Sequence, residues 1–341
     1  MDPIARDSIR KQLSALGLAE RYFDSVVFFG LHELGVFRLL TSGPKTFEAL
    51  QQAVGGNSDT FRAMLDAAVA LRVLSKEGEL YGAEEDLLDC VARPGSPAYV
   101  GEWVEFLQAF VTPLMQMPEA VRTGRPPADH VEIFESGDTP EARRMTRAMD
   151  VYARSRGIEI AQRLRFEGVH TLLDLGCGSG AYSIAITERH PHVRAVLLDL
   201  PGPIAEAKRL AQERGVTDRL TFVASDGEHY RPEHPFDAVL ISNVLNMLGP
   251  EKSRRILEHC YEMIVPGGQV MVQAQYLNDD RVSPRWPALV SLMQRAVSKE
   301  GRGHAIGETT QWLGGAGFVN VKHVRFSLWN VCSCLIGYRP R

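Results

Sequence analysis

Residues 170–180 read His-Thr-Leu-Leu-Asp-Leu-Gly-Cys-Gly-Ser-Gly, and this stretch decides the fold. The apolar run through Asp174 predicts a buried parallel strand, and the alternating glycines predict a tight loop that opens into a helix near Ala181. Glycine permits positive φ and a close approach of the backbone to a ligand, while the first turn of a helix offers unpaired N–H groups. The pattern is typical of a nucleotide-cofactor loop in an α/β domain.

The spacing of the glycines indicates which cofactor the loop binds. A dinucleotide loop needs G-x-G-x-x-G, so that a pyrophosphate can lie on the helix N-terminus. Here the third glycine, Gly180, comes one residue too early, and Asp174 precedes the loop. A carboxylate that faces the ligand repels phosphate but suits a cationic cofactor that carries an amino group. We therefore predict S-adenosylmethionine.

Acidic residues at the ends of later strands support the same cofactor. Asp199 ends a second apolar strand and is placed to accept both ribose hydroxyls. Asp226 ends a third strand, where it can accept the adenine amino group. The alternative is an ordinary α/β domain with chance acids at its strand ends. The residues expected at the cofactor are Asp174, Gly176, Gly178, Asp199, Leu200, Asp226, Gly227 and Ser242.

Composition excludes several classes of protein. The 341 residues are enough for two domains, and a net charge of −4 gives no support for nucleic-acid binding. We find no apolar run long enough to span a bilayer and no secretory leader, so we expect no membrane partner. Five scattered cysteines suit free thiols in a reducing, cytoplasmic compartment, and their spacing does not suggest a metal site.

The N-terminal part, residues 1–95, is predicted to be a helical domain. Helices are expected at about 19–31, 32–42, 46–50 and 58–71, followed by a hairpin over 73–81 with its turn at Glu77-Gly78. Three helices and a hairpin predict a winged helix, which could bind DNA or form a dimer. The helix 58–71 carries Arg62 as its one basic residue and is otherwise largely apolar or small, so we expect it to be buried against another subunit. The module is thus predicted to form a homodimer.

The remainder is predicted to comprise a helical region, 96–167, and a cofactor domain, 168–341. Helices are expected at about 98–110, 112–123, 131–135 and 140–166. Beyond residue 168, alternating strands and helices predict a Rossmann-like, doubly wound sheet. The last two strands, 318–326 and 330–337, have no helix between them and must pair antiparallel at the C-terminal edge, joined at about 327–329.

With these motifs the chain resembles the caffeate/acetylserotonin-type O-methyltransferases, including bacterial members that tailor natural products. The resemblance covers essentially the whole length. Residues 34–44 are similar to the family's dimerisation module, and Arg147-Ala148-Met149 to its substrate-facing helix. The glycine loop and the Asp-Leu-Pro at 199–201 match its cofactor elements. Pro266-Gly267-Gly268 and residues 315–318 match two of its later turns.

One departure from the family concerns the general base. The resemblance places a histidine base where this chain has Asn246, and an amide cannot accept the proton of an acceptor hydroxyl. The family's two histidine-orienting acids also have no counterparts near 303–305 and at Leu335. The acceptor could therefore ionise unaided, it could react through carbon or nitrogen, or another residue could act as base.

His304 is the candidate for such a base, because the resemblance places its loop over the acceptor pocket. The alternative is a loop histidine that is hydrogen-bonded to backbone. His259, expected in mid-helix, and His323, on an edge strand, are poorer candidates.

Aromatic and methionine side chains suggest a flat, apolar acceptor, although some of them will be ordinary core residues. Met149 matches the family's substrate-clamping methionine. The residues expected at the acceptor are Trp103, Phe106, Met149, Tyr152, Asn246 and Met293.

We therefore predict a homodimeric methyltransferase that acts on a small aromatic or polyketide-type acceptor, most readily at a hydroxyl, with alignment replacing the base. Methylation at carbon or nitrogen is the alternative. A decarboxylase, hydroxylase or pericyclase on the same fold, and a winged-helix regulator that senses the cofactor, are the remaining hypotheses.

Overall fold

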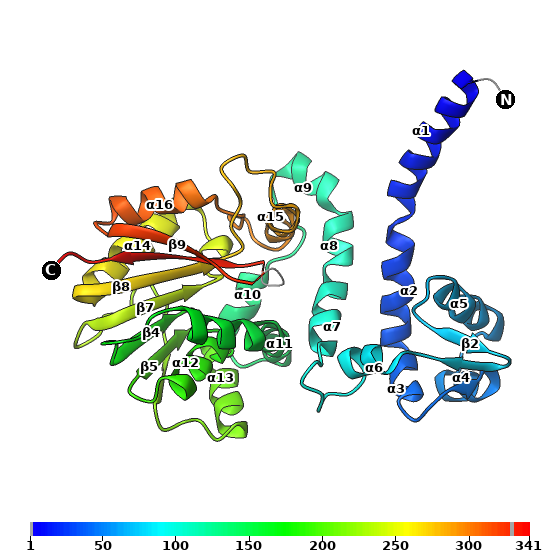
Figure 1. Ribbon diagram of the computed structural model, residues 1–341, viewed down its shortest axis with the longest axis horizontal. Coiled ribbons are helices and arrows are strands. Elements are labelled where there is room, and N and C mark those ends of the chain that lie inside the picture. Colours follow the sequence, from blue (N-terminus) through cyan, green and yellow to red (C-terminus); the bar gives the residue numbers. More distant parts are fainter. Residues whose placement is uncertain (1–2, 328–330) are drawn as a thin grey trace. The chain divides into compact units, whose positions relative to one another are not determined.

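Residues 3–327 and 331–341 are described in the computed structural model, and the chain divides into two compact units, Met1–Gln108 and Ala109–Arg341 (Figure 1). Each unit is described separately. The division at residues 95 and 167 that the sequence suggests stays a prediction.

The second unit is built on a seven-stranded sheet in the order β6-β5-β4-β7-β8-β10-β9. The strands are β4 (Thr171–Leu175), β5 (Arg194–Asp199), β6 (Leu220–Ala224), β7 (Phe236–Ser242), β8 (Ile264–Ala274), β9 (Val319–Arg325) and β10 (Ser333–Tyr338). Strands β6, β5, β4, β7 and β8 are mutually parallel. The predicted doubly wound sheet is confirmed. It brings the carboxyl ends of β4, β5, β6 and β7 to one edge, where ligands of such sheets bind.

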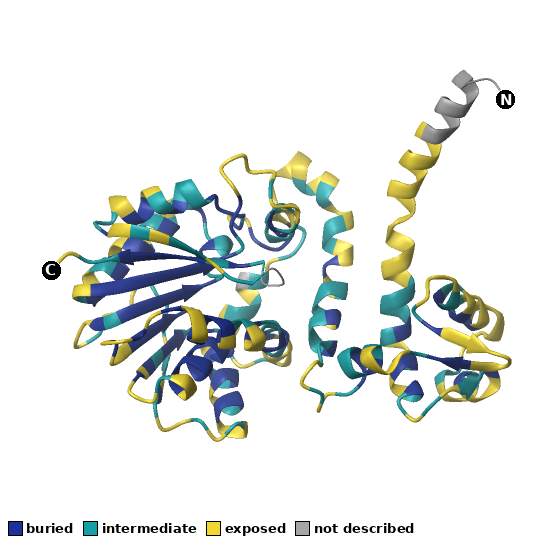
Figure 2. Cartoon of the chain, viewed as in Figure 1, coloured by how far each residue is buried: buried dark blue, intermediate teal, exposed yellow. Residues whose placement is uncertain are grey.

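The antiparallel pairing near the C-terminus is confirmed as well, but the C-terminal strand is not the outermost one. Strand β10 pairs antiparallel with both β8 and β9, so that β9 forms the edge. The reason is burial: β10 is apolar and buried along most of its length, whereas β9 is largely exposed (Figure 2). A polar strand is better suited to an exposed edge. The predicted junction at 327–329 lies largely outside the described residues.

Helices cover both faces of this sheet. The helices described in this unit are α8 (Val111–Met115), α9 (Met117–Thr123), α10 (His130–Glu135), α11 (Pro140–Arg163), α12 (Ala181–Arg189), α13 (Pro201–Glu213), α14 (Pro250–Met263), α15 (Arg285–Val297) and α16 (Ile306–Gly315). Leu172 belongs to a core cluster with α11, α12 and α13, while its neighbour Leu173 belongs to one with α14 and α16. This alternation is what a strand buried on both faces requires. The helix predicted over 112–123 is split at Gln116 into α8 and α9.

Helix α11 packs unusually closely on α12, because Gly157 has no side chain. A Cβ at this position would lie 2.9 Å from the Ala181 carbonyl oxygen. Further along α11, Arg147 pairs with the fully buried Glu206 of α13 at 2.5 Å. These contacts fix α11, which carries Met149 and Tyr152, against the two helices that follow β4 and β5.

The first unit contains seven helices and a small sheet among the described residues. The helices are α1 (Pro3–Glu20), α2 (Tyr22–Glu33), α3 (Val36–Leu40), α4 (Phe47–Val54), α5 (Ser58–Ala70), α6 (Glu85–Val91) and α7 (Gly101–Ala109). Strand β3 (Leu80–Gly82) lies between β1 (Lys45–Thr46) and β2 (Ser75–Glu77). The predicted hairpin is present, but its turn is Gly78-Glu79, because Glu77 pairs with Leu80 and Gly78 adopts φ +60°.

Within its own unit α5 buries one face, and its burial against another subunit stays a prediction. Phe61, Leu65 and Ala68, at i, i+4 and i+7, are buried in the core of their own unit, while Arg62 is exposed. Helix α5 is therefore an ordinary amphipathic helix. Large exposed apolar side chains occur along α1 and α2; they are Leu13, Leu16, Leu18, Tyr22, Phe23 and Val26.

Candidate cofactor and acceptor site

The loop between β4 and α12 depends on its glycines for conformation and for space. Gly176, Gly178 and Gly180 adopt φ of +73°, +55° and +76°, which L side chains rarely adopt. A Cβ on Gly176 would lie 2.3 Å from a methyl of Val244, and one on Gly180 would lie 2.6 Å from Leu197. Gly178 faces open space. The loop is thus packed at both ends and open in the middle.

Asp199, the last residue of β5, holds this loop in place. Its Oδ2 accepts the N–H of Gly178 and its Oδ1 the N–H of Leu200, both at 2.7 Å. A carboxylate can accept about four hydrogen bonds, so two amides leave capacity for a diol. Burial raises the pKa of Asp199 to about 6. Leu200 is the N-cap of α13.

Asp174 is fully buried within β4, beneath the loop. Its Oδ2 accepts a hydrogen bond from the Ser183 hydroxyl at 2.6 Å, whereas its Oδ1 is buried without a partner. Burial raises the pKa of Asp174 to about 7. An unpartnered buried carboxylate oxygen is costly unless a donor or a cation reaches it. The ammonium of a cationic cofactor would be such a partner.

The other predicted cofactor residues lie along the same sheet edge. Asp226 follows β6 and stays partly exposed, and its Oδ1 accepts the N–H of Glu228 at 2.9 Å. A Cβ on Gly227 would lie 3.2 Å from Leu175, so this residue packs against the end of β4. Ser242 ends β7 and donates its hydroxyl hydrogen to Gln273. The edge presents three carboxylates, which fits a cationic ligand that lacks phosphate.

Asn246 lies in a short 3₁₀ helix, η1 (Leu245–Met247), that follows β7. Its side-chain Oδ1 is buried without a partner, and its backbone carbonyl accepts the N–H of Arg302 at 2.8 Å. Val244, directly before η1, is the residue that meets Gly176. The cofactor loop and the segment that carries Asn246 are therefore in direct contact.

His304 is buried, and its ring is engaged with backbone. Its Nε2 lies 2.7 Å from the carbonyl oxygen of Leu245, and a carbonyl only accepts, so Nε2 carries the hydrogen. Its Nδ1 lies 3.7 Å from Glu308, and burial lowers the His304 pKa. Of the two roles considered for His304, this geometry supports the hydrogen bond to backbone. His259 and His323 are likewise bonded, to the Tyr230 carbonyl and to Ser333.

The predicted acceptor residues are distributed over both units. Met149 and Tyr152 on α11 and Met293 on α15 are half-buried in the second unit. The Tyr152 hydroxyl accepts a hydrogen bond from Gln275 at 2.8 Å. Trp103 and Phe106 stack on each other in α7 of the first unit, with ring centroids 4.9 Å apart. Their role at the acceptor stays a prediction.

Several polar side chains that the sequence did not predict lie in the same region as Tyr152. The Arg156 guanidinium lies 3.4 Å above the Tyr152 ring, and burial raises the Tyr152 pKa. The Tyr182 hydroxyl, Gln273 Nε2 and Gln275 Oε1 are buried without hydrogen-bond partners. The sequence does contain a signal for them: the Gln-x-Gln at 273–275 places two polar side chains at the end of an apolar strand. Such buried groups require a ligand or water with matching polar atoms.

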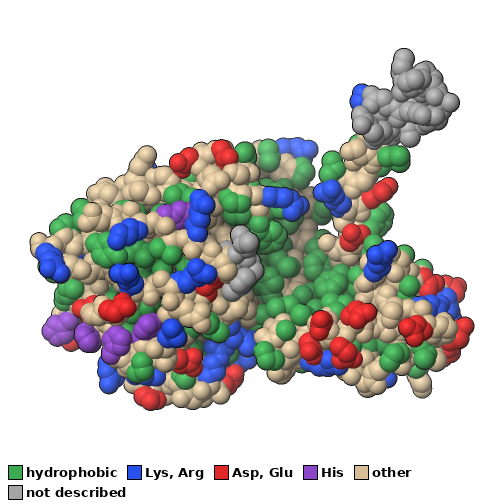
Figure 3. Space-filling view, viewed as in Figure 1, with side chains coloured by type: hydrophobic (Ala, Val, Ile, Leu, Met, Phe, Trp, Pro, Cys, Tyr) green, Lys and Arg blue, Asp and Glu red, His purple; other side chains and the backbone are tan. Residues whose placement is uncertain are grey.

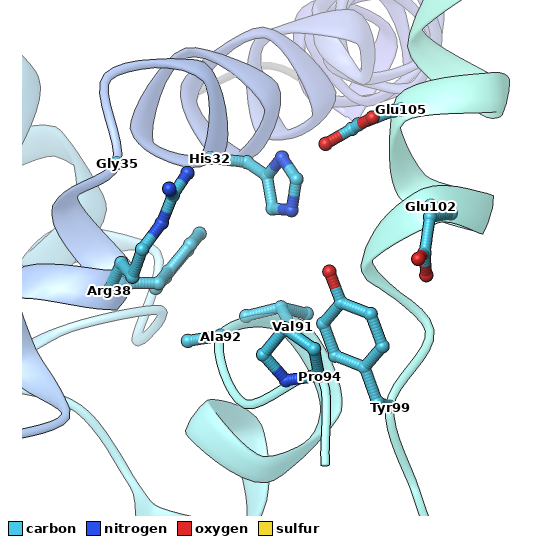
Figure 4. A pocket seen from close by; sticks show the side chains of 10 residues that line it. His32, Gly35, Arg38, Val91, Ala92, Pro94, Tyr99, Glu102 and Glu105 are labelled. Atoms are coloured by element: carbon cyan, nitrogen blue, oxygen red, sulfur yellow. The ribbon is translucent and has the colours of Figure 1, made fainter. Parts of the chain in front are cut away.

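A separate cavity of about 250 Å³ lies in the first unit. Its lining includes His32, Arg38, Tyr99, Glu102 and Glu105, which point toward one another (Figure 4). None of the predicted cofactor or acceptor residues lines it. The cavity is therefore distinct from the site at the sheet edge.

The described residues were searched for metal-binding groups and for membrane-spanning helices. Within them, no group of three or more His, Cys, Asp or Glu side chains is arranged to hold a metal ion. Across the same residues, no helix combines the length and apolar composition needed to cross a bilayer.

The chain is similar in sequence and in fold to known methyltransferases. The sequence model of the O-methyltransferase domain matches residues 117–319. The chain is 29% identical over 300 residues to 3-hydroxy-5-methyl-1-naphthoate 3-O-methyltransferase of Streptomyces sahachiroi, covering 86% of each protein. It is 28% identical over 330 residues to the tetracenomycin polyketide synthesis 8-O-methyl transferase TcmO of Streptomyces glaucescens, covering 96% of each. The human N-acetylserotonin methyltransferase structure with SAM shares the fold, with a TM-score of 0.82 at 22% identity over 100% of this chain and 99% of that one.

Proposed function

Since the chain belongs to the O-methyltransferase family and is an S-adenosylmethionine-dependent methyltransferase, we propose that it methylates a hydroxyl of a small aromatic, polyketide-type acceptor that ionises without a protein base. The single observation that carries this proposal is Asn246, which stands where the family places a base, two residues after the Val244 that meets the cofactor loop, and whose buried amide oxygen has no partner. The acceptor class is supported by the two Streptomyces relatives, whose names specify a naphthoate and a polyketide acceptor.

The sheet-edge residues would hold the cofactor as follows. Asp199 would accept the ribose hydroxyls while it retains the Gly178 amide, and Asp226 would accept the adenine amino group. Asp174 would offer its free oxygen toward the ammonium, and Gly176 and Gly178 would let the backbone approach closely. Leu200, Gly227 and Ser242 would line the same edge. When bound, S-adenosylmethionine supplies an electrophilic methyl group.

The protein would then contribute orientation and exclusion of water. The acceptor oxygen would arrive already ionised, its proton having gone to solvent, and the site would hold it in line with the methyl group that the cofactor supplies. Asn246 can donate an amide hydrogen to the acceptor, and Met149, Tyr152 and Met293 would line its apolar body. Alignment of two bound reactants can supply about 7–11 kcal/mol of the barrier, so a base is not required.

Matched acceptors test the absence of a base. 2-Hydroxy-1,4-naphthoquinone has a hydroxyl flanked by a carbonyl and is ionised at neutral pH, whereas 2-naphthol is not. With labelled S-adenosylmethionine at pH 7 we expect the quinone to give a methyl ether and 2-naphthol to react at least about 10-fold more slowly. Mass spectrometry identifies the methylated atom. Equal rates on both acceptors, or methyl transfer to carbon, would contradict the proposal.

We also propose that the protein is a cytoplasmic homodimer assembled through the first unit. All five cysteines are free thiols, as a reducing compartment favours. The exposed apolar side chains of α1 and α2 are the surface that a second copy would cover. The alternative of a DNA-binding regulator receives no support from charge, because acidic side chains are prominent on the face of the first unit seen in Figure 3.

A further inference from the structure

The segment between α15 and α16 bonds every backbone carbonyl of η1. The Ser298 hydroxyl donates to the carbonyl of Met247 at 3.2 Å. The Arg302 N–H donates to the carbonyl of Asn246 at 2.8 Å, and His304 Nε2 donates to that of Leu245 at 2.7 Å. We call residues 298–304 the clamp segment. Three consecutive carbonyls are thus held by one neighbouring stretch of chain.

Helix η1 has little stability of its own. It is a three-residue 3₁₀ helix, and neither Val244 nor Leu248 caps it with a side chain. Its own hydrogen bonds are the two short-range ones from the N–H groups of Met247 and Leu248. A single turn of this kind is marginal in isolation. The position of Asn246 is therefore set by contacts from outside η1: the packing of Leu245 in the core and the hydrogen bonds to the three carbonyls.

Among those bonds, that of His304 comes from the most firmly held side chain. His304 is 3% exposed, and its ring packs edge-on against Trp312 of α16 with centroids 4.9 Å apart. Glu308, one turn into α16, lies beside Nδ1 and forms ion pairs with Arg302 and, at 3.0 Å, with Arg281. The imidazole is thus held by burial and by its packing against Trp312, and Nε2 is the ring nitrogen that forms a hydrogen bond, to Leu245.

We propose that His304 is a positioning residue that fixes Asn246, through the Leu245 carbonyl, at the distance from the cofactor loop that methyl transfer requires. This inference rests on the proposed role of Asn246. It replaces the expectation that His304 takes a proton from the acceptor. The role requires a donor at Nε2 and does not require titration of the ring.

Two substitutions separate positioning from simple loss of a side chain. In His304→Leu the packing against Trp312 is largely kept while the donor is lost; in His304→Gln an amide N–H can still reach Leu245. With 2-hydroxy-1,4-naphthoquinone as acceptor, we expect His304→Leu to lower kcat about 10- to 100-fold, since misplacement by about 1 Å can cost 100-fold. We expect His304→Gln to restore most of kcat. The dissociation constant for S-adenosylmethionine should change less than about 2-fold in either variant.

A double variant tests whether His304 acts through Asn246. If it does, His304→Leu should lower kcat in the native background but have little further effect in Asn246→Ala, because coupled residues are not additive. His190→Leu is the matched control. His190 makes the same kind of bond, from Nε2 to the Ala161 carbonyl at 2.8 Å, but follows α12 away from the site. It should keep native kcat.

The outcomes distinguish failure of this inference from failure of the proposed function. Equal losses from His304→Leu in both backgrounds, or no rescue by glutamine, would overturn the positioning role. Full activity of Asn246→Ala would overturn the proposed role of Asn246 itself. A crystal structure of His304→Leu gives a readout independent of the acceptor: a shift of η1 by about 1 Å supports the clamp, and an unmoved η1 contradicts it.

Discussion

Asp199 forms hydrogen bonds that its position in the sequence does not predict. The end of an apolar strand predicted a ribose acceptor, but the carboxylate also accepts two backbone N–H groups, from Gly178 and Leu200. The bond from Gly178 depends on the folded path of a loop 21 residues earlier in the chain. Local sequence can therefore nominate a candidate cofactor residue, but not the other groups that its side chain binds.

Asp199→Asn should weaken both the loop and cofactor binding. An amide has one acceptor oxygen, so one of the two N–H groups loses its partner, and a charge-assisted hydrogen bond is worth about 1.5–3 kcal/mol. We expect the dissociation constant of S-adenosylmethionine to rise about 10- to 100-fold, as measured by calorimetry. Asp218→Asn, an exposed carboxylate before β6, is the control and should leave binding unchanged.

Stability should depend on pH because two buried carboxyls have raised pKa values. The pKa of Asp174 is about 7 and that of Asp199 about 6, both above the ordinary 3.8. The folded state holds these protons more tightly than the unfolded state, so the ligand-free protein loses stability as pH rises through this window. Melting temperatures between about pH 5 and about pH 8 should fall, and Asp174→Asn should flatten the fall. A rising melting temperature in this range would contradict the assignment.

At the scale of elements, apolar runs bounded by turn residues predicted β4 to β7, although β6 lies at the end of the sheet and is only partly buried. The antiparallel pairing of β9 and β10 was predicted because no helix lies between these two strands in the sequence. Patterns along the chain do not show how much of an apolar helix its own domain buries: in α5 only Phe61, Leu65 and Ala68 are buried. The order of β9 and β10 also depends on which strand is the more polar, a comparison across the sheet rather than along the chain.

The ion pairs between α11 and α13 provide a test at this scale. Glu206 of α13 is fully buried and pairs with Arg147 and Arg209, both partly exposed. Glu206→Gln removes the charge between two arginines, and we expect a loss of about 1–3 kcal/mol, less than for a fully buried pair. Urea unfolding measures it. Glu213→Gln, which removes an exposed partner of Arg147, should cost less than about 1 kcal/mol.

For the whole molecule, the sequence predicted an N-terminal module of helices with a hairpin but placed the subunit contact on α5. The structure packs one face of α5 into its own unit and exposes apolar residues of α1 and α2, so both helices join α5 as candidates for that contact. Composition alone cannot separate a helix buried by its own domain from one awaiting a partner, because both are rich in apolar residues.

A single charge on α2 should test the proposed dimer. Phe23 is 52% exposed, so Phe23→Glu should leave the monomer folded but place an unpaired carboxylate in a subunit contact. We expect light scattering to show a monomer and circular dichroism to show native helix content. Val282→Glu, at a 74% exposed apolar residue of the second unit, is the control and should stay dimeric. A dimer in both variants would place the contact elsewhere.

The contact between Gly176 and Val244 constrains how the enzyme can be redesigned. Because a Cβ on Gly176 would collide with Val244, the segment that leads to Asn246 rests on bare backbone of the cofactor loop. A bulkier residue at 244, introduced to reshape the acceptor pocket, would displace the glycine loop and weaken binding of S-adenosylmethionine. Acceptor selectivity and cofactor affinity are therefore not independent variables at this position. Libraries that aim at new acceptors should keep valine there, or go smaller.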